Sequence, residues 1–400
     1  MATTPSVAKK VPFSTNGTLL LHLDFLLLGI VMTFIGPMLP ILSARWGLND
    51  TQSGSLIFAQ FFTSMFGMLL SGVMTQRYGY RITLIWGGAL MAGGMALLAS
   101  GPWGLGITAV CILGFGYGLT SPAGNLRTAE INPENSASAL NVINAVWGIG
   151  AMSSGYLVEI ARRAHRPGFF LYGTAAALMV LLIALGFSRF VPDSHAKSLS
   201  TAEDDKSLWK KPILLLICAL FYVYVGTETS FGGWIATYAG RVDPKAQAIA
   251  SITSFYWGAL LVGRGVAPFF LRFHRATTIA RAGLTIALSG SLALVAAHNV
   301  RLVVVGAILA GLGLASIFPI SVSLLPGWFG ASARRASGPI FASGNMGGAT
   351  VPWFMGLLST HYASLRLAFM VPLLGAMAML IFYIAAFAGR QQRAQAAIYC

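Results

Sequence analysis

Charged residues are scarce in this chain. Only 9% of its 400 residues are Asp, Glu, Lys or Arg, and Asp and Glu together number 11. A soluble domain covers its surface with about 25% charged residues. A soluble globular protein of this length is therefore excluded.

Residues that build disulfides, metal centres and catalytic sites are also few. Cys111 and Cys218 fall in apolar stretches and Cys400 is the last residue, so we expect no disulfide framework. The six histidines show no metal-ligand spacing, and no Walker-type phosphate loop occurs. The polar segments are too short to house a catalytic domain. We expect no metal, no cofactor and no enzymatic activity.

Long apolar runs are what the sequence has in abundance. Hydrophobic residues make up 56% of the chain, and its mean hydropathy is +0.73. A helix that spans a bilayer needs about 20 apolar residues. The sequence therefore predicts an all-α integral membrane protein with twelve transmembrane helices. They are placed near residues 17–43, 52–75, 82–101, 104–129, 136–160, 168–190, 212–240, 247–271, 277–298, 302–326, 336–360 and 366–388.

The net charge of +15 is spread over the loops and forms no basic domain for nucleic acid. If both termini are cytoplasmic, 16 of the 26 Lys and Arg lie inside and eight outside, as the positive-inside rule requires. The first apolar run is too long for a signal peptide and lacks a cleavage site. We predict a multi-pass, monomeric protein of the cell membrane, or of the inner membrane in a bacterium, with both termini cytoplasmic.

The longest polar segment between apolar runs is Pro192 to Lys211. It predicts a cytoplasmic linker, residues 192–211, between an N-terminal six-helix bundle (1–191) and a C-terminal one (212–400).

An internal repeat supports this division. A shift of about 196 residues places Gly67 on Gly263, and the run Ile112 to Pro122 on Ile308 to Pro319 within a one-residue slip. Two pseudo-symmetric bundles around a central path are the arrangement that permits alternating access.

Several motifs carry a resemblance to a known family. Gly72 to Arg81 resembles the loop after the second span of the major facilitator superfamily, with Gln76 where that family has Asp. Tyr224 to Tyr238, with its Gly, Glu, Trp and Tyr, is similar to the seventh span of fucose permease-like sugar:proton symporters. Gly311 to Pro319 and Leu140 to Ala151 are similar to that group's tenth and fifth spans. The resemblance covers essentially the whole chain and implies the twelve-helix fold and sugar transport.

One departure concerns the proton carrier. Where fucose permease has a Glu four residues before the Asn of its fourth span, this chain has Ser121 before Asn125. That carrier is therefore not inherited.

Candidate substrate-binding residues follow from sugar chemistry. Hydroxyls need paired donors and acceptors, while C–H faces lie against aromatic rings. Asn141 and Asn144 share one helix face, as do Tyr224 and Glu228. Each residue has an alternative role, in helix packing for the aromatic residues and in interhelical hydrogen bonds for the amides. The candidates are Gln60, Asn125, Asn141, Asn144, Tyr224, Glu228, Phe231, Trp234, Trp257 and Asn345.

Ionisable residues inside the apolar runs are the candidates for coupling or gating, because a charge in hydrocarbon needs a partner or a water-filled path. Asp24 and Arg127 are predicted to lie at similar depth, with Glu130 one turn beyond Arg127. Their pairing would serve either proton coupling or a static inner gate. Glu228 would accept a substrate hydroxyl or a proton, and Arg264 would bind an anion or the end of a neighbouring helix.

Three transport functions remain open. The first is symport of a neutral monosaccharide such as a hexose, driven by protons or, less readily, by sodium. The second is proton-coupled efflux of drugs or metabolites. The third is carriage of an organic anion, with Arg127 and Arg264 as ligands.

Overall fold

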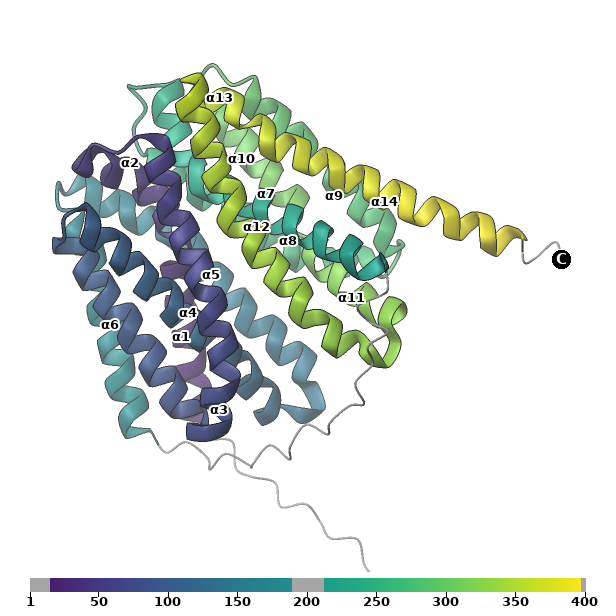
Figure 1. Cartoon of the computed structure of the whole chain (residues 1–400), viewed down its shortest axis with the longest axis horizontal. Coiled ribbons are helices and arrows are strands. Elements are labelled where there is room, and N and C mark those ends of the chain that lie inside the picture. Colours follow the sequence, from purple (N-terminus) through teal and green to yellow (C-terminus); the bar gives the residue numbers. More distant parts are fainter. Residues whose placement is uncertain (1–14, 189–211, 397–400) are drawn as a thin grey trace, which may run out of the picture.

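The computed structural model describes residues 15–188 and 212–396, and these form helices joined by short connections. The predicted linker, 192–211, lies outside the described residues. Figure 1 shows the arrangement. The helices are α1 (Thr15–Thr33), α2 (Ile35–Trp46), α3 (Asp50–Ser100), α4 (Trp103–Ile131), α5 (Ser136–Arg163), α6 (Gly168–Phe187), α7 (Pro212–Val242), α8 (Ile249–Leu271), α9 (Ala276–Val295), α10 (Val300–Leu314), α11 (Ile317–Phe329), α12 (Ala333–Tyr362), α13 (Leu365–Ala368) and α14 (Met370–Ala396).

Each predicted span has a helical counterpart. The first is the pair α1 and α2, which bend by 44° where they meet, and the tenth and twelfth are the pairs α10–α11 and α13–α14. Helix α3 covers the second and third spans, because its 51 residues consist of two helical parts that both pack against α4. Its two parts turn at Gly79, whose φ of 83° and ψ of 165° are accessible to glycine alone. The predicted all-α fold is confirmed.

Apolarity alone identifies fewer spans. Within the described residues, seven helices are long and apolar enough to cross a membrane, and the bent pair α1–α2 would be an eighth. Helices α5, α8 and α12 do not reach that apolarity. They carry Ser, Asn and Gly because they pack against the opposite half of the molecule, where α5 contacts α8 and α12 contacts α3.

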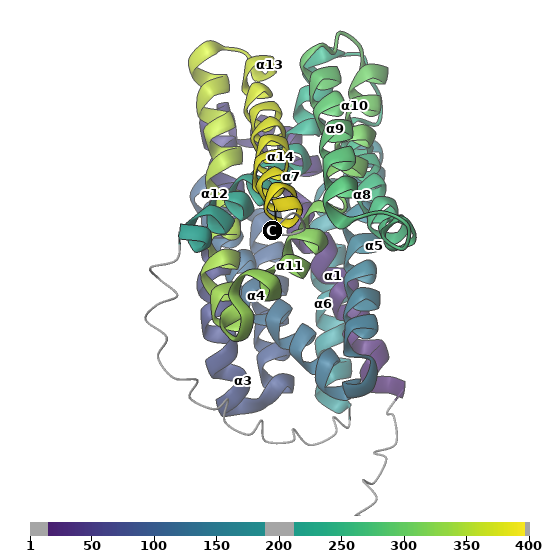
Figure 2. The same ribbon diagram turned by 90° about the vertical axis from the view of Figure 1, so that its right-hand side faces the viewer.

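The helices gather into two bodies, α1–α6 and α7–α14, which lie side by side in Figure 1, and in Figure 2 α7–α14 lie nearer the viewer. The internal repeat recurs as two equivalent helix crossings. A Cβ added at Gly114 would lie 2.1 Å from the Gln60 carbonyl oxygen, and one at Gly311 would lie 2.3 Å from that of Tyr256. Glycine is therefore required where α4 crosses α3 and where α10 crosses α8. The boundaries 1–191 and 212–400 stay a prediction.

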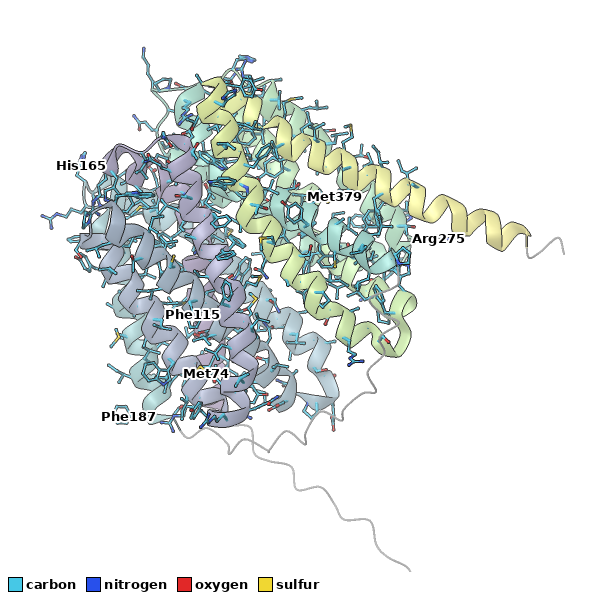
Figure 3. All side chains as sticks on the ribbon, viewed as in Figure 1. Met74, Phe115, His165, Phe187, Arg275 and Met379 are labelled. Atoms are coloured by element: carbon cyan, nitrogen blue, oxygen red, sulfur yellow. The ribbon has the colours of Figure 1, made fainter. Side chains whose placement is uncertain are left out.

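The chain crosses repeatedly between two ends of the molecule. We call them the Asp50 end, where α3 begins, and the Arg127 end, where α4 finishes. Figure 3 labels His165 near the first, and Met74 and Phe187 near the second. Which end faces the cytoplasm stays a prediction.

The two halves are tied together at the Asp50 end. Asp50 accepts two hydrogen bonds from the Arg241 guanidinium, one of 2.7 Å, and a third from the Ser359 hydroxyl. Beside it, the Thr51 amide donates to the Thr360 hydroxyl at 3.0 Å. Asp50 is also in the first turn of α3, where the helix dipole favours a carboxylate. These contacts join α3 of one half to α7 and α12 of the other.

Candidate functional site

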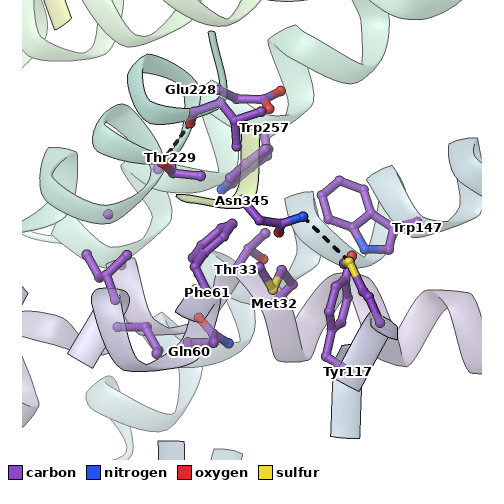
Figure 4. Close-up of a pocket in the computed structure, with 17 residues that line it drawn as sticks. Met32, Thr33, Gln60, Phe61, Tyr117, Trp147, Glu228, Thr229, Trp257 and Asn345 are labelled. Carbon is purple, nitrogen blue, oxygen red and sulfur yellow. Dashed lines mark hydrogen bonds between the residues drawn. The ribbon is translucent and has the colours of Figure 1, made fainter. Parts of the chain in front are cut away.

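A cavity of about 160 Å³ lies between the two halves. Helices α1 to α5 of the first half and α7, α8 and α12 of the second contribute to its wall. Figure 4 shows the residues around it. They are Met32, Thr33, Ile35, Gly36, Ile57, Gln60, Phe61, Met68, Tyr117, Trp147, Val225, Glu228, Thr229, Gly232, Gly233, Trp257 and Asn345.

Two glycines let the halves meet at one side of the cavity. A Cβ at Gly36 of α2 would lie 1.9 Å from the Gly232 carbonyl oxygen of α7, so the two backbones are in direct contact. Gly232 also leaves room for the Trp257 indole, because a Cβ there would lie 2.6 Å from ring atom Cζ2. The position of Trp257 thus depends on the absence of a side chain at residue 232.

The one charged residue of the wall is Glu228, and behind it lie Arg264 and two tyrosines that bond to it. Glu228 Oε1 accepts hydrogen bonds of 2.9 Å from Arg264 Nη2 and 2.9 Å from the Tyr224 hydroxyl. The Tyr256 hydroxyl donates to the Glu228 carbonyl oxygen at 3.0 Å. Tyr224 and Glu228 are four residues apart on α7, so they share the face that Arg264 reaches from α8. The pair of Glu228 and Arg264 carries no net charge.

The pairing of Arg264 was not foreseen from the sequence. We expected it to bind an anion or the end of a neighbouring helix, and the structure pairs it with Glu228 instead. Arg264 does not line the cavity, and its buried Nε has no partner among the described residues. The reason is spatial, since α7 and α8 pack side by side and bring together residues 36 positions apart.

Four of the ten predicted substrate-binding residues line the cavity: Gln60, Glu228, Trp257 and Asn345. The Gln60 amide nitrogen donates to the Val31 carbonyl at 2.8 Å, and that of Asn345 to the Phe341 carbonyl at 3.1 Å. Both amide nitrogens thus donate within the protein. No hydrogen bond among the described residues engages the two amide oxygens.

The other six lie outside the cavity wall. Asn144 donates to Asn125 at 3.1 Å and so links α5 to α4, the alternative role weighed for the amides, while Asn141 is exposed. Tyr224 lies behind Glu228 as its hydrogen-bond donor. Phe231 and Trp234 are fully buried on α7. Phe231 packs on Tyr256 and Phe369, and the Trp234 indole donates to the Pro352 carbonyl at 2.9 Å.

Asp24 lies apart from this cavity and has no described partner. Its exposed fraction is 2%, and its Oδ2 has no hydrogen-bond partner among the described residues. The neighbouring Phe25 packs on Gly124 of α4, which would otherwise place a Cβ 2.4 Å from the ring. Asp24 is thus a buried carboxylate on α1, a helix that packs against α4 and α5.

The expected pairing of Asp24 with Arg127 is absent from the described contacts of Asp24. Arg127 pairs with Glu130 at 3.6 Å and lies over the ring of Tyr80, whose hydroxyl also donates to Glu130. Glu130 lies one turn from Arg127 on the same helix, so these two side chains can pair whatever the packing of the other helices. Asp24 is on another helix and would need a particular packing to reach Arg127.

Several residues of the wall were missed, among them Thr33, Phe61, Tyr117 and Thr229. The most informative omission is Trp147. The internal repeat pairs it with Asn345, a predicted site residue, so the repeat could have identified it. For the others the sequence carries no comparable signal.

Comparison with known proteins shows the family. The protein-family model described as Major Facilitator Superfamily matches residues 23–290 of the sequence, about two thirds of the chain. The chain is 24% identical over 351 residues to the glucose/mannose transporter GlcP of Bacillus subtilis, covering 83% of this chain and 85% of GlcP. It is 24% identical over 384 residues to a glucose/galactose transporter of Brucella abortus, covering 88% and 90%.

Solved structures agree on the fold. A point mutant of the nucleoside transporter NupG superposes with a TM-score of 0.80 at 14% identity, covering 92% of this chain and 99% of NupG. A point mutant of the E. coli fucose:proton symporter FucP superposes with a TM-score of 0.63 at 18% identity, covering 92% and 97%. The family is one of multi-pass membrane transporters and not of enzymes. The resemblance drawn from the motifs is confirmed, and the chain belongs to the Major Facilitator Superfamily as a secondary transporter.

Proposed function

We propose that this transporter carries a neutral monosaccharide, a hexose in the first instance, in symport with protons. The observation that carries the proposal is that Glu228, the one charged residue of the cavity wall, is balanced by Arg264, while the rest of the wall is uncharged and includes two amides and four aromatic rings. A neutral ligand with many hydroxyls fits such a wall, because it needs acceptors, donors and apolar faces together. The glucose transporters among its relatives support the same substrate class.

The organic-anion alternative is less well supported. It needs a cationic side chain available to the ligand, whereas the Arg264 guanidinium is bound to Glu228 and the Arg127 guanidinium to Glu130. Neither arginine lines the cavity. An anion would have to displace a carboxylate from its partner, which costs more than binding at a vacant cation.

Asp24 supports proton coupling. A carboxylate buried to this degree without a partner is costly when ionised. We infer that Asp24 binds a proton in the conformation described here and releases it when the helices rearrange. Arg127 and Glu130, whose contacts are made near the Arg127 end, serve as a gate in this proposal.

The test is uptake into proteoliposomes of labelled glucose, galactose and mannose, and of glucuronate as the anionic analogue. Each is measured with an inward proton gradient, with an inward sodium gradient and with neither. Gradient-driven accumulation of a neutral hexose, lost in Asp24→Asn while hexose exchange persists, is the expected result. Accumulation of glucuronate alone would replace the sugar by an organic anion. Sodium-driven accumulation would replace the coupling ion.

A further inference from the structure

Aromatic and basic side chains gather around the turn between α8 and α9, at the Arg127 end of the second half. Helix α8 ends at Leu271 and α9 begins at Ala276. Figure 3 labels Arg275 beside this turn, on the side of the molecule away from α1–α6. We call this surface the α8–α9 patch. It consists of Phe269, Phe270, Arg272, Phe273 and Arg275, all of them exposed.

Three phenyl rings form the apolar part of the patch. The ring centroid of Phe269 lies 5.6 Å from that of Phe270 and 5.4 Å from that of Phe273. Their exposed fractions are 58%, 47% and 69%, in the order of the sequence. The 23 residues of α8 reach about 34 Å, slightly more than the hydrocarbon core of a bilayer. The patch therefore lies where a span ends, at the level of the lipid headgroups.

Two arginines form the cationic part. The guanidinium groups of Arg272 and Arg275 have no hydrogen bond or ion pair among the described residues. The described part of the second half contains two acidic residues, and neither lies near the patch. Glu228 is bound to Arg264 at the cavity, and Asp243 follows α7 at the Asp50 end. Within the described residues, the charge of the patch is therefore not balanced by the protein.

The corresponding turn of the first half is different. It lies at Gly79, between the two parts of α3, where the Tyr80 hydroxyl donates to Glu130 and the Arg127 guanidinium pairs with the same carboxylate. The exposed fraction of Tyr80 is 6%. The repeat of about 196 residues places Pro326 at the position of Glu130. The second half thus lacks the carboxylate that binds the tyrosine and the arginine of the first.

We propose that the α8–α9 patch binds an anionic phospholipid, with the lipid phosphate against Arg272 and Arg275 and the acyl chains against the three phenyl rings. Guanidinium groups match phosphate oxygens in geometry and charge, and basic residues next to a span attract anionic lipids. A soluble phosphate would leave the rings in water. A zwitterionic lipid would bring a cation of its own to the arginines. The inference does not depend on which substrate is transported.

The experiment locates the lipid directly. The purified full chain in detergent is mixed with phosphatidylglycerol that carries a photoreactive group in one acyl chain, and cross-linked peptides are identified by mass spectrometry. We expect labelling of the peptide that contains residues 269–275. Unlabelled phosphatidylglycerol should suppress this labelling at a lower concentration than phosphatidylcholine with the same acyl chains, and glycerol 3-phosphate should not suppress it.

Charge variants test the role of the two arginines. Arg272→Gln combined with Arg275→Gln should raise the phosphatidylglycerol concentration needed for half-maximal labelling about thirtyfold, which is about 1 kcal/mol for each arginine. Arg272→Lys combined with Arg275→Lys keeps both charges and should retain most of the labelling. The matched control is Lys245→Gln combined with Arg301→Gln, which removes two exposed cations at the Asp50 end and should change nothing.

Three results would overturn the proposal. The first is equal suppression by phosphatidylglycerol and phosphatidylcholine with no effect of the arginine variants, which would reduce the patch to a surface in contact with lipid of any kind. The second is suppression by glycerol 3-phosphate as strong as that by phosphatidylglycerol, which would make it a site for soluble phosphates. The third is absence of labelling at residues 269–275 in the wild type.

Discussion

The pair of Glu228 and Arg264 offers the most informative perturbation. Glu228→Gln keeps the shape of the side chain and removes its charge, so the Arg264 guanidinium remains beside the cavity uncompensated. The two groups are 2.9 Å apart, and Arg264 retains 30% of its side-chain exposure. Breaking a fully buried pair costs about 3–5 kcal/mol. Because water screens part of this pair, we expect about 2–3 kcal/mol of lost stability for Glu228→Gln and similarly for Arg264→Gln.

The double variant is the decisive measurement. Glu228→Gln with Arg264→Gln removes both charges and leaves no isolated ion, so its loss should be smaller than the sum of the single losses by about 1.5–3 kcal/mol. Thermal unfolding of the detergent-solubilised protein, followed by tryptophan fluorescence, gives the order of stability. Hexose binding measured on the same samples separates lost stability from lost affinity.

A matched control is available in Glu159. It accepts hydrogen bonds from Arg162 and Arg163, but both arginines are more exposed than Arg264. Glu159→Gln should therefore cost less than Glu228→Gln. If the losses of the two single variants at the cavity simply add in the double variant, the two charges do not compensate each other. The proposal of a neutral substrate would then lose its main support, which is the charge balance of Glu228 and Arg264.

Three further predictions follow from backbone geometry and from the contacts between the halves. Gly79→Ala should lower the unfolding temperature, because its φ of 83° and ψ of 165° cost a residue with a Cβ about 1–3 kcal/mol; an unchanged temperature would contradict the bend described for α3. Gly36→Ala should abolish hexose uptake while the protein still assembles in the membrane, because the added Cβ would lie 1.9 Å from the Gly232 carbonyl oxygen and push α2 away from α7. Uptake by this variant at the wild-type rate would refute that contact. Asp50→Asn should increase the labelling of cysteines introduced beside the Asp50 end, because it removes the charge that binds Arg241. Arg241→Gln should increase the labelling equally. Unchanged labelling in both variants would show that this ion pair does not hold the two halves together at the Asp50 end.

The sequence by itself determined the helices and their number. Backbone polar groups in lipid must be satisfied within the segment, so a run of about 20 apolar residues leaves few alternatives to a helix. The repeat of about 196 residues likewise aligned the two segments that hold the equivalent crossings at Gly114 and Gly311. These are local or periodic properties, which a sequence carries directly.

The site depended on tertiary packing. Tyr224 and Glu228 could be placed on one face of α7 from their spacing, but only the packing of α7 against α8 brings Arg264 to Glu228. Equal depth in the membrane suggested that Asp24 would pair with Arg127, yet rotation of each helix about its axis decides which side chains meet. That rotation is set by contacts between helices distant in the sequence. The sequence therefore determined which residues lie at membrane depth, and the tertiary structure decided which of them face one another.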